Sequence, residues 1–485
     1  LGTIPEGYDA DNLAVQTSVA GQVNIVADDP DYGPVVFWDG DDVANHNNRR
    51  VDGGDGVWRR GGNAFTDANG IANGPMNPHP GFVVFTGQAG NVSVVTGFGE
   101  IHPDGMQFAV DGYRIAGELI SWDAGDRIVR VGDGSLAGAD YTAEIANQIS
   151  GPGRLVKTDL GTLILSGESD YSGGTLVQGG TLLVNGSILD VEVGVDGRLG
   201  GTGSIENDAH ILGTLAAGNS IGTLTIEGDL TMAAGSRLEV EVDALGNADR
   251  IDVTGVAHLE GGEVVTLASG GDYAAATTYT ILTAEGGVEG EFEGVSSNLA
   301  FLDAALAYGG KDVQLTLTRN GVTYGNVGET RNQVATGEAV EALAAGNGIY
   351  DRVLTLSAAD ARMAFDRLSG EVHASAKGVL ALQSRDLRDA MSDRVGAAFE
   401  ALGLPEQGKA FGPAFWTAGS ASGGSLKSDG NAAGLTYSAG NLFMGADAMF
   451  NQDWLLGFAV GYGQTSLSIG DRSSTASSGN YHVGV

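Results

Sequence analysis

The sequence predicts a mainly β protein with one helical segment near its C-terminal end. Glycine accounts for 80 of the 485 residues, whereas proline contributes only 10. Short runs of Val, Ile, Leu and Thr end at Gly, Asn or Asp, which is typical of short strands joined by tight turns. Collagen is excluded, because its glycine would recur at every third position with abundant proline. Disorder is disfavoured, because 42% of the residues are hydrophobic and only 18% are charged.

A repeat within the first 320 residues predicts how these strands are arranged. Between 150 and 260, Gly-x-Leu triplets place Leu182, Leu199 and Leu215 at spacings of 17 and 16 residues. Strands this short, in repeats this short, are typical of a β-solenoid, in which each coil pairs with the coils before and after it. We therefore expect these three leucines to stack in one buried ladder. A set of ordinary β-sandwiches is the alternative interpretation.

Residues 329–403 change to a helical period, with apolar residues recurring every three or four positions. The last helical stretch, about 374–402, would measure roughly 43 Å, which exceeds the roughly 30 Å apolar core of a bilayer. Its arginines, Arg385, Arg388 and Arg394, would be unfavourable against lipid but are compatible with a water-lined channel. A soluble helical linker is the alternative.

Residues 411–485 alternate with a period of two. Large apolar residues occupy Leu456, Phe458, Val460 and Tyr462, and Gly or Ala stands between them. This pattern is typical of transmembrane β-strands that turn an apolar face to lipid and a small or polar face inward. The aromatic residues predicted to form girdles at the membrane surfaces are Trp416, Phe443, Trp454 and Tyr462.

The charge balance and the absence of cysteine limit the classes of partner and site. The chain has 61 acidic and 25 basic residues and a net charge of −36. Such a surface repels phosphate groups, so no nucleic-acid partner is expected. The sequence has no cysteine, which excludes disulfides and thiolate metal sites. It starts at Leu1 without a signal peptide, and we expect it to be trimmed at that end.

Several stretches carry a resemblance to one family. Gly153–Gly167, Asp170–Thr175 and Gly179–Ser187 resemble the passenger-associated repeat of bacterial autotransporters. Leu215–Leu224 and Asn247–Val253 resemble the C-terminal passenger segment of the pertactin-like group. The resemblance extends from about residue 150 to the end of the sequence and is weaker before it.

The resemblance implies a pertactin-like type V autotransporter of a Gram-negative bacterium. The implied fold is mainly β, with a right-handed parallel β-helix (solenoid) passenger, an α-helical linker and an incomplete antiparallel outer-membrane β-barrel. The implied domains are a β-rich passenger segment (1–150), the β-helix with stable C-terminal coils (151–320), a linker whose last helix spans the pore (321–404), and the first barrel strands (405–485). We expect a fragment at both ends.

The implied function is export of the chain's own passenger across the outer membrane to the cell surface, where it stays or is released. Expected partners are outer-membrane lipid, the barrel-assembly machinery and an unidentified surface molecule of a host or neighbouring cell. Adhesion or surface interaction is the expected role, and a surface-displayed β-helical enzyme acting on polysaccharide is the alternative. We expect no enzyme, no cofactor, no metal and no catalytic residue. The candidate site residues are the lumen-facing arginines Arg385, Arg388 and Arg394.

Two motifs resemble nucleophile motifs. Gly218–Gly222 matches the Gly-x-Ser-x-Gly elbow around Ser220, but a strand follows it where the elbow requires a helix. Gly132–Ser135 resembles a protease serine motif in scrambled order. Both are interpreted as turns between strands.

Two further motifs resemble ligand sites. Gly53–Gly56 and Asp39–Asp42 resemble calcium-loading turns, but the tandem nonapeptides that build a full oxygen cage are absent. We expect solvated turns there, with loose calcium association as the alternative. The pairs Gly310-Lys311 and Gly408-Lys409 lack the rest of a phosphate-binding loop, so neither is expected to bind a nucleotide.

Overall fold

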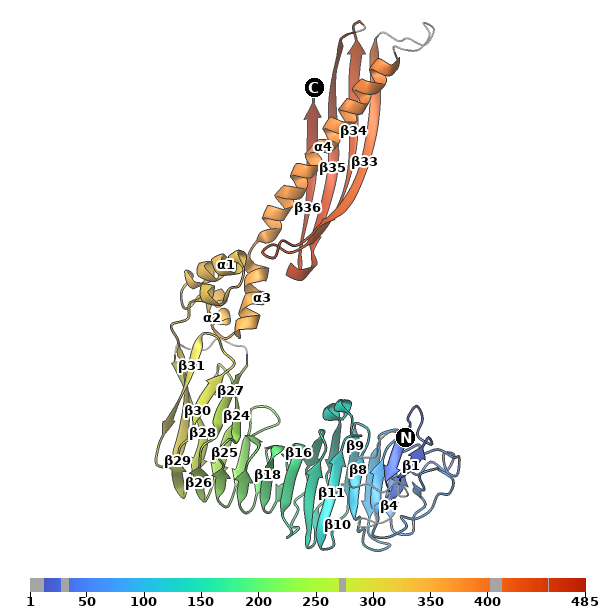
Figure 1. Ribbon diagram of the computed structural model, residues 1–485, viewed down its shortest axis with the longest axis vertical. Coiled ribbons are helices and arrows are strands. Elements are labelled where there is room, and N and C mark those ends of the chain that lie inside the picture. The colour runs from blue at the N-terminus through green and yellow to red at the C-terminus, as the bar shows by residue number, and fades with distance from the viewer. Residues whose placement is uncertain (1–12, 28–34, 270–275, 402–411, 452) are drawn as a thin grey trace. The chain divides into compact units, whose positions relative to one another are not determined.

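The computed structural model describes residues 13–27, 35–269, 276–401, 412–451 and 453–485 (Figure 1). The chain divides into two compact units, residues 1–320 (unit 1) and 321–485 (unit 2). In the described ranges, unit 1 consists of strands, turns and one short 3₁₀ helix, and the α-helices all belong to unit 2. The prediction of a mainly β protein with few helices is confirmed.

The first half of unit 1 contains strands of two to ten residues. Their bounds are β1 (Leu13–Gln16), β2 (Asn24–Ala27), β3 (Val35–Trp38), β4 (Gly56–Arg59), β5 (Phe65–Thr66), β6 (Phe82–Phe85), β7 (Asn91–Val95), β8 (Gly105–Phe108), β9 (Tyr113–Gly117), β10 (Ile120–Ser121), β11 (Gly125–Val131), β12 (Thr142–Ile145), β13 (Ile149–Ser150), β14 (Gly153–Thr158), β15 (Thr162–Leu165) and β16 (Thr175–Val184). The 3₁₀ helix η2 (Leu136–Asp140) follows β11.

The second half continues in the same way. Its strands are β17 (Ser187–Ile188), β18 (Val191–Gly200), β19 (Ser204–Ile205), β20 (Ala209–Ile211), β21 (Thr214–Ala216), β22 (Thr223–Ile226), β23 (Leu230–Met232), β24 (Arg237–Val242), β25 (Arg250–Val253), β26 (Val256–Leu259), β27 (Glu263–Ala268), β28 (Ala276–Ala284), β29 (Gly287–Gly290), β30 (Gly294–Ser297), β31 (Leu302–Tyr308) and β32 (Asp312–Arg319).

Most strands of unit 1 pair in parallel with a strand one repeat earlier and one repeat later. Leu182 of β16 lies beside Leu199 of β18, which lies beside Leu215 of β21 and then Leu238 of β24. None of the four leucines is more than 1% exposed. The predicted ladder of Leu182, Leu199 and Leu215 is therefore confirmed. Beyond Leu215 the spacing grows to 23 residues at Leu238 and 26 at Val264.

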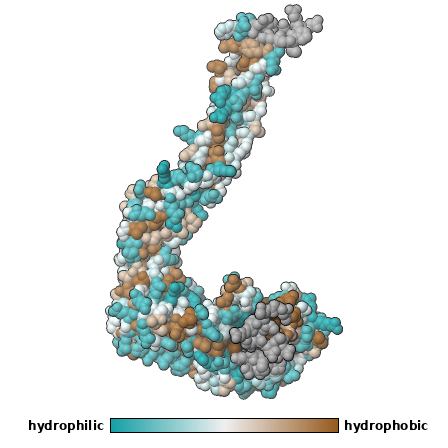
Figure 2. Space-filling model, viewed as in Figure 1, coloured by the Kyte–Doolittle hydropathy of each residue, from teal (hydrophilic) through white to brown (hydrophobic). Residues whose placement is uncertain are grey.

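The alternation of side chains explains why these short segments are strands. In β24, Leu238, Val240 and Val242 are buried, and the charged residues between them point outward. Glycine ends strands where the backbone turns: Gly201 has a φ of 110°, a region that favours glycine. A side chain there would also collide with the carbonyl oxygen of Val184. Hydrophilic residues cover much of the face of this unit seen in Figure 2.

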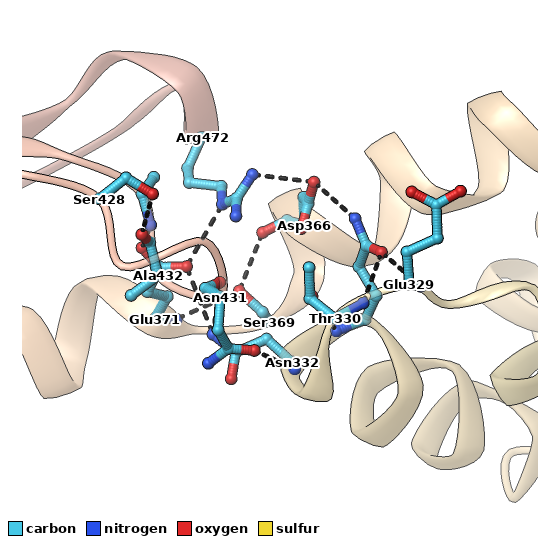
Figure 3. A network of polar contacts seen from close by, with 12 residues as sticks. Glu329, Thr330, Asn332, Asp366, Ser369, Glu371, Ser428, Asn431, Ala432 and Arg472 are labelled. Carbon is cyan, nitrogen blue, oxygen red and sulfur yellow. Dashed lines mark hydrogen bonds and ion pairs between the residues drawn. The ribbon is translucent and has the colours of Figure 1, made fainter.

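Unit 2 begins with four helices, α1 (Arg331–Glu341), α2 (Gly348–Leu354), α3 (Ala358–Leu368) and α4 (Glu371–Glu400), preceded by the 3₁₀ helix η3 (Tyr324–Val327). Thr330 and Gln333 form a capping box at α1 (Figure 3), and Ser357 caps α3 by accepting from the Asp360 N–H. Helix α4 starts three residues earlier than expected and measures about 45 Å. Within the described ranges, no helix combines the length and the apolarity that crossing a membrane requires.

Four long strands complete unit 2: β33 (Pro413–Leu426), β34 (Leu435–Met449), β35 (Leu455–Ile469) and β36 (Ser474–Gly484). They pair antiparallel in sequence order, and the 3₁₀ helix η6 (Gly470–Arg472) lies between the last two. Helix α4 packs along this sheet (Figure 1). Gly403 and Pro405, which the sequence offers as the stop signal of this helix, lie outside the described residues.

Candidate functional site: a helix on an antiparallel sheet

The sheet of unit 2 has two chemically different faces. Leu456, Phe458, Val460 and Tyr462 of β35 are 44–68% exposed on the face turned away from α4. The residues between them are Gly or Ala and belong to the face that α4 covers. The predicted alternation is confirmed for this strand.

The exposed apolar residues of neighbouring strands form one band. In the strand register, Met444 pairs with Val460, which pairs in turn with Val483 on the next strand. Leu442 pairs with Tyr462, which pairs in turn with Tyr481. The residues of the band are Phe415, Leu442, Met444, Leu456, Phe458, Val460, Tyr462, Tyr481 and Val483. At about 3.4 Å per residue, the stretch from 456 to 462 spans about 20 Å, close to the ~25 Å apolar band of outer-membrane barrels.

Apolar contacts hold α4 to the opposite face. Leu387 of α4 packs with Phe443 and Ala459, and Val379 packs with Leu435 and Ile469 nearer the start of the helix. Small residues make room for these rings, because a side chain at Gly461 would overlap the Phe443 ring. The aromatic-girdle prediction is therefore wrong for Phe443, which is fully buried under α4.

Trp416 also departs from the girdle prediction. It belongs to the same inner face and packs against the Leu387 cluster, in space left by Gly445. Trp454 and Tyr462, in contrast, are 70% and 51% exposed, so they can face a membrane. The parity of the position, not the residue type, decides which face an aromatic side chain joins.

One of the three predicted arginines binds the sheet directly. Arg394 donates from Nε and Nη2 to the two carboxylate oxygens of Asp447 in β34, at 2.7 and 2.8 Å. The Asp447 side chain is only 6% exposed. Such a two-point ion pair fixes both position and orientation, so it joins the last turns of α4 to the inner face of the sheet.

The other two arginines do not contact the described strands. The Arg388 side chain is 68% exposed, and its Nε lies 4.0 Å from the exposed carboxylate of Asp389. Arg385 is also exposed. The structure therefore brings Arg394 to the sheet and leaves Arg385 and Arg388 on the uncovered side of α4.

Polar residues that the sequence analysis missed lie between the helix and the sheet. The Asp386 carboxylate accepts from Asn441 Nδ2 at 2.7 Å and from the Ser420 hydroxyl at 3.2 Å. Gln383 donates to the hydroxyl of Ser422 at 3.2 Å. Helical spacing could have found them, because positions 383, 386, 387, 390, 391 and 394 fall on one face of a helix.

The serine motifs of unit 1 are turns in the structure. Ser220 is exposed, and in the described residues no hydrogen bond joins its hydroxyl to a base. The neighbouring Gly222 N–H donates to Asp249, and His258 instead contacts Glu289 at 3.2 Å. Burial raises the pKa of Asp249 to about 6, although two backbone N–H groups oppose this shift.

Ser135 and its neighbours are likewise occupied by local contacts. The Asp133 carboxylate accepts from the Ser135 N–H at 2.9 Å, and the hydrogen bonding to Ser135 lowers the pKa of Asp133. This arrangement closes a turn and brings no histidine to Ser135 among the described contacts.

The candidate calcium turns use their carboxylates on the backbone. Asp39 is buried and accepts from the Asp52 N–H, Asp41 accepts from the Val57 N–H, and Asp55 accepts from the Asn91 N–H. Across the described part of the chain, no group of three or more side chains could hold a metal ion. Gly310-Lys311 forms the turn between β31 and β32, and Gly408-Lys409 lies outside the described residues.

Two segments of the chain match known protein families, and longer segments are similar to known proteins. Residues 415–485 match the autotransporter beta-domain family, and residues 155–184 match the passenger-associated-transport-repeat family. An adhesin autotransporter of Brucella suis is 36% identical over 256 residues, which cover 51% of this chain and 7% of the adhesin. An extracellular serine protease of Serratia marcescens is 32% identical over 393 residues, which cover 70% of this chain and 37% of the protease.

A second extracellular serine protease of Serratia marcescens is 28% identical over 394 residues. These relatives contradict the prediction that the protein is not an enzyme. That prediction was based on the absence of a catalytic arrangement around Ser220 and Ser135. Two serines without a catalytic base do not exclude enzymatic activity, because the chain spans only 37% of the length of the proteases and one fold can carry different activities.

The band of exposed apolar residues, the helix on the inner face and the two family matches agree with one another. They place the sheet in the outer membrane and the passenger at the cell surface. The chain belongs to the autotransporters, with passenger-associated repeats followed by an autotransporter β-domain.

Proposed function

We propose that this chain exports and anchors its passenger, with α4 occupying the lumen of a barrel whose first strands are β33–β36. The observation that carries the proposal is that α4 covers the face of the sheet opposite to the apolar band. A helix that threaded lipid would have to bury Arg394 and Asp386 in hydrocarbon, which is strongly unfavourable. In a lumen, both find partners on the inner wall.

A lumen would also explain the two arginines of α4 that do not contact the described strands. Arg385 and Arg388 lie on the exposed side of α4, where a closed barrel would hold water and its remaining inner wall. We propose that they face this water or inward carboxylates of that wall. The helical linker, with α4 as its last helix, would then be residues 321–404, and the first barrel strands would be residues 405–485.

For unit 1 we propose a right-handed parallel β-solenoid, with a β-rich segment at 1–150 and the stable repeats at 151–320. Its support is the parallel pairing of β16, β18, β21 and β24 and their buried leucine ladder. Each repeat that folds outside the cell buries another rung of leucine or valine, so folding favours continued export. Barrel-assembly machinery is the expected partner for insertion of the sheet.

The passenger's own role is inferred as adhesion to a surface molecule of a host or neighbouring cell. The 36% identical adhesin supports this role. The serine proteases support proteolysis as a second candidate. This chain is similar both to an adhesin and to proteases. We therefore infer that the part of the chain similar to both kinds of protein serves export, and that the rest of the passenger determines the activity.

Display and cell binding of the full-length protein test these proposals together. Whole cells carrying it should lose unit 1 to externally added protease, and they should bind host or neighbouring cells more than cells without it. Failure of external protease to reach unit 1 would contradict export. Cleavage of added protein substrates without cell binding would replace adhesion by proteolysis as the role.

A further inference from the structure

We propose that residues 75–80 of unit 1 form an acid-sensitive switch, in which protonation of His79 releases this segment from the following repeat. The segment, here called the return segment, ends the long connection between β4 and β6, residues 60–81, which leaves the repeat, forms β5 and returns. The proposal goes beyond the proposed function, because it concerns a conformational change within the passenger and not its export or anchoring.

The first part of the connection is held by aromatic packing and by an amide. Strand β5 pairs antiparallel with β3, so that Phe65 lies beside Trp38. The centroid of the Phe65 ring lies 5.3 Å from that of Trp38 and 5.6 Å from that of Trp58. Asn73 Nδ2 donates to Asp39 Oδ2 at 2.8 Å. None of these contacts depends on the protonation of a histidine.

The return segment, in contrast, is held through an imidazole. The backbone N–H of His102, which precedes β8 in the following repeat, donates to His79 Nε2 at 3.3 Å. The two imidazole rings meet edge to face, with centroids 5.8 Å apart. Met76 of the same segment is only 6% exposed, so the segment packs against the protein. A ring nitrogen that accepts a hydrogen bond carries no proton, so His79 is neutral while the segment is closed.

A proton on His79 would meet positive charge from two other segments. His102 Nε2 lies 2.9 Å from the Glu100 carboxylate, and His102 Nδ1 lies 3.3 Å from the Asp123 carboxylate. Only a protonated ring can donate from both nitrogens, so these two contacts favour a positive charge on His102. Arg60, at the start of the connection, adds another. Burial and the nearby charges of Arg60 and His102 lower the pKa of His79.

The neighbouring carboxylates do not offset this positive charge. Glu100 and Asp123 bind His102, and Asp104 binds Arg127 at 2.9 Å. The backbone N–H of Asp104 donates to the carbonyl oxygen of Gly81, directly after the return segment. In the described residues, no carboxylate lies within ion-pair distance of His79. A protonated His79 would therefore lack a counter-charge in the closed position.

Acid consequently destabilises the closed segment. A protonated Nε2 cannot accept a hydrogen bond, so the His102 N–H would lose its partner. Because the pKa of His79 is lowered from its ordinary value of 6.5 while the segment is closed, the open segment binds the proton more tightly. The closed position is thus fully favoured above pH 6.5 and loses stability as the pH falls below it.

A second histidine of unit 1 forms the opposite kind of contact. His46 Nε2 lies 2.9 Å from the carbonyl oxygen of Gly40. A carbonyl oxygen only accepts, so the His46 nitrogen is the donor, and it can donate in both protonation states. Acid leaves this contact intact, which makes His46 the matched control for His79.

The reactivity of introduced cysteines tests the switch in the full chain, purified in detergent. The chain has no cysteine, so Met76→Cys places a single thiol in the return segment. Leu136→Cys places one at a position that is 87% exposed. Dividing the labelling rate of Met76→Cys by that of Leu136→Cys cancels the effect of pH on the thiol itself. Between about pH 7.5 and about pH 5.5, this ratio should rise several-fold.

A buried cysteine separates local opening from general unfolding in acid. Ala143 is fully buried in β12, away from the return segment. Ala143→Cys should stay unlabelled at both pH values. An equal rise at Ala143→Cys would mean that acid unfolds the whole unit, and the switch would be overturned.

Three substitutions in the Met76→Cys background assign the response to His79. His79→Gln keeps an acceptor oxygen at a similar reach and does not titrate, so the ratio should stay low at both pH values. His46→Gln should keep the rise of wild type. Arg60→Ala removes one positive charge beside His79, so the rise should become smaller.

A ratio that does not change with pH in wild type would overturn the switch. A rise that persists in His79→Gln, or one that His46→Gln abolishes, would overturn it as well. If His79→Gln is labelled rapidly at both pH values, the glutamine does not hold the segment and Arg60→Ala decides. A reduced rise in Arg60→Ala then supports the switch, and an unchanged rise overturns it.

Discussion

Units 1 and 2 use the same period-two alternation with opposite polarity. In unit 1, β24 turns Leu238 and Val240 inward and charged residues outward. In unit 2, β35 turns Phe458 and Val460 outward and Gly461 inward. The difference follows from the solvent, because water surrounds the strands of unit 1 and lipid meets the outer face of the sheet in unit 2. A strand pattern therefore specifies two faces, and the size and charge of each face specify the environment it meets.

The largest effect should come from placing a charge in the ladder of unit 1. Leu199→Asp would bury a carboxylate without a partner, at a cost of about 3–5 kcal/mol or more. We expect loss of folded passenger and of surface display, measured by external protease and thermal melting. Val195→Asp is the control, since Val195 is 74% exposed on the same strand and should change stability by less than ~0.5 kcal/mol. Equal effects of the two substitutions would contradict a buried ladder.

The reverse experiment in unit 2 places a charge on the outward face. Met444→Arg lies in the apolar band and should cost about 2–4 kcal/mol of barrel stability in a membrane. Ser438→Arg, on the same face nearer the polar end, should cost only about 0–1 kcal/mol. The measurement is the amount of heat-modifiable, folded barrel. The comparison between the units would fail if the two positions tolerated arginine equally.

A third prediction distinguishes the three arginines of α4. Asp447→Ala would leave Arg394 without its partner, and because Arg394 is partly exposed we expect a loss of about 2–3 kcal/mol. Arg388→Ala should change little, since that side chain is mostly exposed. The unfolding midpoint of the barrel in urea would show the difference. A larger effect at Arg388 would mean that the essential contacts lie elsewhere in the lumen.

How far the sequence predicted this site depends on the range of the interactions involved. The leucine ladder and the alternation of β35 follow from spacing within the strand repeat and within one strand, so both were predictable. The pairing of Arg394 with Asp447 joins residues 53 positions apart and was not. From the sequence, Arg385, Arg388 and Arg394 were equivalent candidates. Only the orientation of α4 about its own axis, which turns Arg394 toward the sheet, distinguishes them. The inward position of Phe443 was readable from its parity with Asn441 and Asp447, which the aromatic-girdle interpretation overlooked.

Buried polar residues of unit 1 show a second limit of the sequence. Lys157 lies in the passenger-associated repeat and is fully buried, where its ammonium group donates to the carbonyl oxygens of Thr158, Asp159 and Gly179. Burial lowers its pKa to about 8. Some of the many acidic residues also stabilise the fold, since Asp55 and Asp229 accept hydrogen bonds from strand N–H groups one repeat away. Composition counts such charges as surface, although the backbone of the neighbouring repeat uses them.

The smallest predicted effect is a pH dependence within unit 1. Asp249 is 3% exposed, and burial raises its pKa from 3.8 to about 6. The folded state therefore binds the proton more tightly than the unfolded state, and this residue's contribution to stability falls as pH rises from about 4 to about 6. Asp249→Asn removes the titrating group, so thermal melting of the exported passenger should depend less on pH in this range.

The overall stability of Asp249→Asn should also decrease, because an amide offers one acceptor oxygen to the two N–H groups of Gly222 and Glu241. Asp252→Asn is the control for general charge effects, since Asp252 is partly exposed and pairs with Arg250 at the surface. An unchanged pH profile in Asp249→Asn would mean that the two backbone donors hold this carboxylate ionised despite its burial. Asp249 would then act as a fixed acceptor between two repeats, and the pH response of unit 1 would have to arise from carboxylates such as Asp133 and Asp243, whose lowered pKa values make stability fall as pH decreases.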